Sequence, residues 1–162
     1  MRNRIREFRI VSSRYSLRNG ERMYILKTEH SFDSAHFLLG YDGKCSNIHG
    51  HRWRVEVEVM SDELKKDKQL RGMYVDFSKL KDDLREKVDY LDHALIIEAG
   101  SLKKTTYKAL KDEQFRIIEF DFRPTAENLA KYLYEQMKES GYQVRKLTVY
   151  ETPNNCASYT EV

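Results

Sequence analysis

The sequence predicts an α+β fold in which two helices cover one face of a four-stranded antiparallel sheet. One segment alternates between apolar and charged residues like a half-buried strand, and two others repeat apolar residues at the spacing of amphipathic helices. The 162 residues contain no internal repeat, low-complexity tract or linker, which indicates one domain over residues 23–162. Two cysteines cannot form a disulfide framework, so we expect a reducing, cytoplasmic location.

Two strands are expected at the start of this domain. Residues 24–37 alternate loosely and are rich in aromatic and β-branched side chains. Residues 49–60 show the clearest pattern, with His49, His51, Trp53, Val55, Val57 and Val59 on one face and Gly50, Arg52, Arg54, Glu56 and Glu58 on the other. The charged face is either solvated or lines a polar channel between subunits.

The first helix is expected after a loop at residues 61–70, with Asp76 or Ser78 as its N-cap. It should end within residues 91–96. Its apolar stripe consists of Phe77, Leu80, Leu84, Val88 and Leu91.

The second half of the chain predicts a strand, a helix and a last strand. Polar residues 100–115 form a loop with a short helical piece, and the strand at 115–120 follows. The second helix lies within residues 123–141, where Thr125 is the N-cap and Gly141 suits the residue after the helix. Its apolar stripe is Leu129, Leu133 and Met137, and residues 142–152 form the last strand.

Residues 1–22 form an Arg-rich extension. They hold seven arginines, no lysine and two glutamates, so that the other 140 residues carry a net charge of −2. The extension could be a nucleic-acid-binding arm, a transit peptide, or a segment upstream of a natural start at Met23, which is the interpretation we favour. Because the rest of the chain is not basic, we expect no nucleic-acid partner. An apolar run such as Ala94–Ile97 is too short to cross a membrane, so no membrane partner is expected either.

The motif CSNIHGH, residues 45–51, combines one thiol with two imidazoles. His49 and His51 are two residues apart on a strand and therefore project from the same face, where both can bind one ion. His36 ends the preceding strand and can join them across a hairpin-sized loop; His30 could replace it, although a surface role explains His30 as well. Three neutral imidazoles with an open position are the pattern of catalytic zinc.

Cys45 allows three interpretations. It could be a small buried apolar residue, or the fourth ligand of a closed zinc site that is catalytically inert. It could also be a thiolate beside the metal that removes a proton from a substrate acidified by zinc.

Three further residues are candidates for acid–base chemistry or binding. Asp92 and His93 are adjacent, so we expect their side chains to point to a shared partner rather than to bond each other, unless they only cap the helix. Glu151 could accept two hydrogen bonds from the N–C–NH₂ edge of a guanine or pterin, or could be an exposed carboxylate.

Six segments, in this order, resemble the 6-pyruvoyl-tetrahydropterin synthase / 6-carboxytetrahydropterin synthase family: SFDSAH, CSNIHGH, YVDFSKLK, LDHALI, PTAENLA and YETPNNCASY. The resemblance covers residues 24–160 and implies a tunnelling fold. In that fold the sheets of several subunits join into a barrel around a channel, usually as a homohexamer, and active sites lie between subunits.

The resemblance also implies a role for each candidate residue. His36, His49 and His51 match the zinc ligands, and Cys45 matches the catalytic proton acceptor. Asp92 and His93 match a catalytic relay on the other face of the substrate, and Glu151 matches the carboxylate that anchors the pterin and takes part in catalysis. Thr125 and Glu127 align with the stretch near the pterin pocket.

Three residues separate Cys45 from His49, as in the bacterial carboxy-forming branch of the family. The implied reaction converts 7,8-dihydroneopterin triphosphate to 6-carboxy-5,6,7,8-tetrahydropterin in queuosine biosynthesis, releasing acetaldehyde and triphosphate. A Cys at position 45 argues against the branch that has Glu there. The alternatives are a pyruvoyl-forming enzyme and a non-catalytic zinc module.

Overall fold

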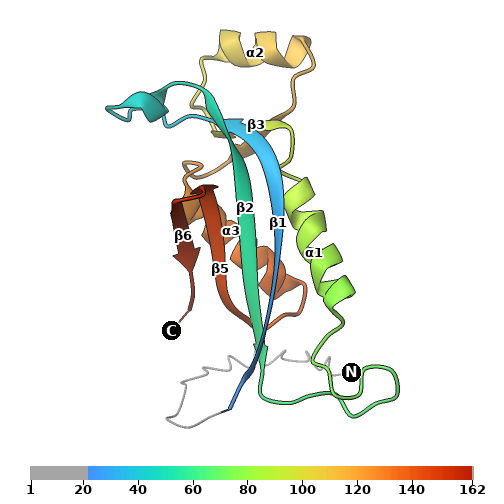
Figure 1. Cartoon of the computed structure of the whole chain (residues 1–162). Coiled ribbons are helices and arrows are strands. Elements are labelled where there is room, and N and C mark those ends of the chain that lie inside the picture. Colours follow the sequence, from blue (N-terminus) through green and yellow to red (C-terminus); the bar gives the residue numbers. More distant parts are fainter. Residues whose placement is uncertain (1–21, 162) are drawn as a thin grey trace, which may run out of the picture.

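The computed structural model describes residues 22–161, and its centre is a long antiparallel hairpin (Figure 1). Strand β1 (Tyr24–His36) pairs with β2 (His49–Ser61) along its whole length, and the loop between them contains a short 3₁₀ turn, η1 (Lys44–Ser46). His36 lies directly opposite His49. Apart from Arg22, the predicted N-terminal extension lies outside the described residues.

The sheet has six strands in the order β4-β3-β1-β2-β5-β6. Strands β5 (Val144–Thr152) and β6 (Asn155–Tyr159) continue the sheet from β2 in antiparallel pairing. On the other side, β3 (Ala94–Glu98) and β4 (Ile117–Phe120) run parallel to β1. The prediction of four antiparallel strands is therefore wrong in number, and the antiparallel direction holds for β1, β2, β5 and β6 but not for β3 and β4. Helix α2 (Lys104–Asp112) forms the crossover that the parallel pair β3–β4 requires.

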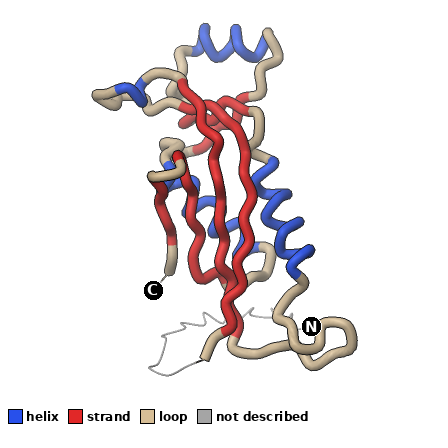
Figure 2. Tube along the Cα trace, in the orientation of Figure 1, coloured by secondary structure: helices blue, strands red, loops and turns tan. Residues whose placement is uncertain are grey.

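Helices α1 (Phe77–Asp89) and α3 (Ala126–Glu139) lie on one face of the sheet, as predicted (Figure 2). Their stripes pack against Trp53 and the valines of β2 in one core, and the buried residues are Leu80, Leu84 and Val88 from α1 and Leu129, Leu133 and Met137 from α3. Phe77 does not belong to the stripe, since it is 60% exposed at the first position of α1. The N-caps are Asp76, which accepts from the Ser78 amide, and Thr125, which accepts from the Asn128 amide.

Several boundaries differ from the prediction. Helix α1 ends at Asp89, and Ala94 already belongs to β3, because the apolar run Ala94–Ile97 forms a buried strand instead of a helix end. A turn after Thr152 adds β6, which was not predicted. The short helical piece was predicted and is α2, and none of its residues is buried. In residues 22–161, no helix has the length and apolarity needed to cross a membrane.

The polar face of the hairpin is covered by ion pairs between neighbouring strands. Arg52 bonds Asp33 at 2.9 Å and Arg54 bonds Glu29 at 2.8 Å. On the same face, Lys27 bonds Glu56 at 3.1 Å, and Arg145 and Lys146 bond Glu58 at 2.7 and 3.0 Å. The alternating charges of β2 thus find their partners within one chain. A channel between subunits is not needed to explain them.

Candidate metal centre

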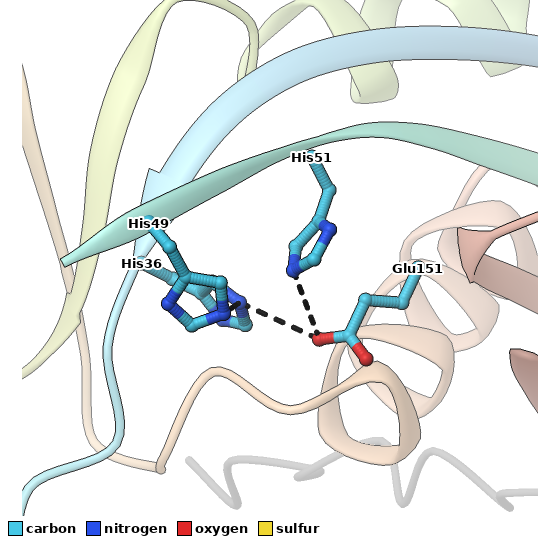
Figure 3. A group of neighbouring side chains, drawn as sticks. All are labelled: His36, His49, His51 and Glu151. Carbon is cyan, nitrogen blue, oxygen red and sulfur yellow. Dashed lines mark hydrogen bonds and ion pairs between the residues drawn. The ribbon is translucent and has the colours of Figure 1, made fainter. Parts of the chain in front are cut away.

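Four side chains from three adjacent strands meet at one end of the sheet: His36, His49, His51 and Glu151 (Figure 3). One ligand atom from each lies within 4.8 Å of the others. The hairpin register brings His36 opposite His49, and the pleat places His51 on the same face two residues along. Glu151 comes from β5, the next strand of the sheet.

Gly50 separates the two histidines of β2 because the strands approach closely there. A Cβ atom at this position would lie 3.3 Å from the Ser34 carbonyl oxygen, tighter than ordinary van der Waals contact. A larger residue would require the main chains of β1 and β2 to shift by a few tenths of an ångström beside the imidazoles.

Main-chain carbonyls orient two of the rings. The Nδ1–H of His36 donates to the Pro124 carbonyl, and the Nδ1–H of His49 donates to the Asn47 carbonyl, both at 2.8 Å. A carbonyl can only accept, so each Nε2 atom is left with a lone pair. The two Nε2 atoms are 3.1 Å apart. Two lone pairs at this distance repel unless a cation or proton lies between them.

The third imidazole, His51, also has a nitrogen atom that lacks a partner in the described chain. Its Nε2 atom is buried, and within residues 22–161 it has no hydrogen-bond partner. Buried polar atoms without a partner are rare and costly, which points to a ligand. Two nitrogen lone pairs and the unpartnered Nε2 of His51 therefore face one small volume.

Several distances between these atoms are close to those between the ligands of a tetrahedral metal ion. In a tetrahedral site with Zn–N bonds of about 2.0–2.1 Å, neighbouring ligand atoms are about 3.3 Å apart. The His36–His49 distance is 3.1 Å, and the Glu151 Oε1 atom lies 3.4 Å from His36 Nε2 and 3.5 Å from His51 Nε2. The donor set and its geometry fit a divalent metal ion with nitrogen preference.

Burial lowers the pKa of His36 and of His51, because desolvation disfavours the imidazolium. Both rings are consequently neutral at pH 7, the form that binds a metal. The fully buried Trp53 lies edge-on to both, with ring centroids 4.9 Å from His36 and 5.2 Å from His51.

Cys45 lies outside this cluster. It is half-buried in the loop before β2, and its sulfur is not among the close ligand atoms in the described chain. Its main-chain carbonyl accepts a hydrogen bond from the Leu38 amide at 2.8 Å. This arrangement disfavours the closed Cys–His₃ site, since the group nearest the imidazoles is the Glu151 carboxylate.

Asp92 and His93 do bond each other, contrary to the prediction. The His93 Nδ1 atom lies 2.6 Å from Asp92 Oδ2 because His93 adopts a left-handed backbone with φ +51°, which turns its ring back toward the preceding residue. The Asp33 amide donates to the other Asp92 oxygen at 2.7 Å. This bond and the one from His93 lower the pKa of Asp92. The His93 side chain is 80% exposed.

The remaining predicted residues occupy simpler positions. Thr125 caps α3, and Glu127 is exposed in its first turn. His30 lies outside the cluster and bonds Asp89 at 3.0 Å. Sequence reasoning missed Asn47 and Pro124, which orient the imidazoles through carbonyl oxygens. Every residue has a carbonyl, so no residue type could have revealed them.

Comparison with known proteins links this geometry to one family. The profile of the family described as 6-pyruvoyl tetrahydropterin synthase matches residues 25–162. A Haemophilus influenzae protein named 6-carboxy-5,6,7,8-tetrahydropterin synthase is 33% identical over 145 residues, covering 86% of this chain and all of the relative. A Synechocystis protein of the same name is 32% identical and covers 85% of this chain and 93% of the relative.

A solved structure has the same fold. The 6-pyruvoyl tetrahydropterin synthase of Plasmodium falciparum superposes with a TM-score of 0.65 at 21% identity, covering 86% of this chain and 98% of that one.

Proposed function

The chain belongs to the 6-pyruvoyl tetrahydropterin synthase family, and we propose that it is a zinc-dependent 6-carboxy-5,6,7,8-tetrahydropterin synthase of queuosine biosynthesis. Its substrate is 7,8-dihydroneopterin triphosphate, and its products are the carboxytetrahydropterin, acetaldehyde and triphosphate. The observation that carries this proposal is the cluster of three imidazoles whose ring nitrogens face one point, in a chain whose relatives bear this name.

His36, His49 and His51 would hold the zinc ion. When bound, zinc acts as a Lewis acid that acidifies the hydroxyl and adjoining C–H groups of the substrate side chain. The Pro124 and Asn47 carbonyls keep the rings in the tautomer that presents Nε2, and such outer contacts commonly contribute 10–100-fold to metal affinity.

Cys45 and His93 would transfer protons on opposite faces of the substrate. A thiolate near a cation has a lowered pKa and can accept a proton from carbon. On the other face, the Asp92 carboxylate keeps a hydrogen on the Nδ1 atom of His93 and stabilises the imidazolium formed when Nε2 accepts a proton.

Glu151 would bind the pterin ring through its N–C–NH₂ edge. Its carboxylate lies 3.4 Å from His36 Nε2, so a ring held by Glu151 would lie beside the metal, with its side chain within reach of zinc. Thr125 and Glu127 are proposed to lie near this pocket.

We also propose that the protein is a homohexamer with active sites between subunits. In support, the His93 ring is 80% exposed, and in the described chain it makes no contact with the metal-binding cluster. A neighbouring chain could supply His93 to a site that holds Cys45 and the three imidazoles of another.

Product analysis tests the proposed reaction. Purified protein loaded with zinc is incubated with 7,8-dihydroneopterin triphosphate, and acetaldehyde and the pterin product are measured. We expect acetaldehyde and 6-carboxytetrahydropterin in equal amounts. A 6-pyruvoyl product without acetaldehyde would instead assign the pyruvoyl-forming reaction, and the absence of any turnover would favour a non-catalytic zinc module.

A further inference from the structure

The loop that carries Cys45, residues 38–48, is held weakly by its own chain. None of its residues is buried, and Leu39, Tyr41 and Ile48 are 51%, 47% and 58% exposed. Apolar packing therefore contributes little to the position of the loop. Because a base must lie within hydrogen-bond reach of the proton it removes, something else has to hold the thiol in place.

Hydrogen bonds inside the loop give it a local shape but do not attach it to the core. The Leu38 amide donates to the Cys45 carbonyl at 2.8 Å, and the Ser46 and Asn47 amides donate to Gly43 and Lys44. Across residues 22–161, one hydrogen bond reaches this loop from beyond strands β1 and β2. It is donated by the Arg123 guanidinium to the Leu39 carbonyl at 2.6 Å.

Arg123 is itself well anchored. Its carbonyl accepts from the Thr125 amide at 2.8 Å and from the Asn128 side chain at 3.0 Å, which attaches it to the start of α3. The next residue, Pro124, is buried and accepts the Nδ1–H of His36. Arg123 thus contacts the loop that carries the proposed base, Cys45, and the next residue, Pro124, contacts the proposed zinc ligand His36.

We propose that Arg123 is a positioning residue for catalysis, which holds the Cys45 loop at a fixed position relative to the metal centre. The inference rests on the proposed function for its kinetic consequence, although the attachment of the loop can be measured independently. A hydrogen bond from a charged guanidinium is stronger than a neutral one, and here it links one half-buried side chain to an otherwise exposed loop.

The test compares zinc-loaded wild type with Arg123→Met, which removes the donor, and Arg123→Lys, which retains one. We expect Arg123→Met to lower kcat about tenfold with little change in KM, the size expected from losing one charge-assisted hydrogen bond. The zinc content should stay unchanged, because Pro124 holds His36 through its main chain. Arg123→Lys should recover part of kcat. The exposed Arg85 on α1 offers a matched control, and Arg85→Met should behave like wild type.

Hydrogen exchange provides the readout that does not depend on activity. In Arg123→Met the Leu38, Ser46 and Asn47 amides should exchange at least about threefold faster, while β2 and α3 remain protected. Unchanged exchange, loss of zinc, or a change confined to KM would each overturn the proposal. If wild type shows no turnover but exchange still increases, the proposed function fails while the attachment of the loop by Arg123 stands.

Discussion

Single hydrogen bonds to main-chain carbonyls determine what the histidines of this protein can do. His36 and His49 each use Nδ1 as a donor, so the nitrogen that faces the cluster has only a lone pair to offer. An imidazole in the other tautomer would present a hydrogen and could not bind a metal. The Pro124 and Asn47 carbonyls therefore select the tautomer that the proposed site requires.

Replacing His36 should empty the site, whereas replacing His30 should not. His36→Gln removes a ligand that is 1% exposed and leaves two imidazoles in the cluster, so we expect zinc content close to zero and activity at background. His30→Gln is the matched control, because His30 bonds Asp89 outside the cluster. Metal analysis after dialysis measures both variants. Zinc loss from His30→Gln with retention in His36→Gln would reverse the assignment.

The histidine spacing could be predicted from sequence, but the geometry of Asp92 and His93 could not. Residues two apart on a strand share a face whatever their neighbours are, so His49 and His51 follow from the alternation of β2. The bond between Asp92 and His93 depends on a positive φ at a non-glycine residue, which is uncommon and which only the surrounding turn imposes. Arg116 stabilises that turn by donating to the Tyr90 and Asp92 carbonyls.

Helices and long strands were easier to predict than short strands. The stripes of α1 and α3 repeat over several turns, and β2 alternates over twelve residues with Val55, Val57 and Val59 on its apolar face. Strands β3, β4 and β6 have five, four and five residues. An apolar run of that length suits a helix end as well as a buried strand, and only its neighbours in the sheet decide between them.

The polar face of the sheet should make stability depend on pH through Glu58. Burial alone would raise the pKa of Glu58, but the hydrogen bonds and charges of Lys146 and Arg145 outweigh it and lower this pKa. A carboxyl whose pKa is lowered in the folded state contributes stability above its unfolded pKa of about 4.3 and loses that contribution as the pH falls.

Urea unfolding of Glu58→Gln at several pH values measures this contribution. The variant should be less stable than wild type at pH 7, and the difference should shrink as the pH falls from about 5 to 3. Glu63→Gln, in an exposed loop, should differ little from wild type at any pH. A difference for Glu58→Gln that stays constant with pH would contradict the assigned ion pairs.

The assembly determines whether one chain contains a complete site. Six chains of 19.3 kDa would form a particle of about 116 kDa, which native mass spectrometry can measure. If Cys45 and His93 of a site come from different chains, the inactive variants Cys45→Ala and His93→Ala should complement each other. Random mixing of the two chains should restore about a quarter of the wild-type activity per site. No recovery in verified mixed oligomers would place both residues of a site in one chain.

The central claim is that the three imidazoles hold zinc while the Cys45 thiol acts as a base beside the metal ion. Zinc content and acetaldehyde formation, measured on the same preparation of Cys45→Ala, test it most directly, with Cys156→Ala as the control for an exposed thiol. We predict full zinc content in both variants, with acetaldehyde formation lost only in Cys45→Ala. Loss of zinc together with the Cys45 thiol, or full activity without that thiol, would contradict the claim.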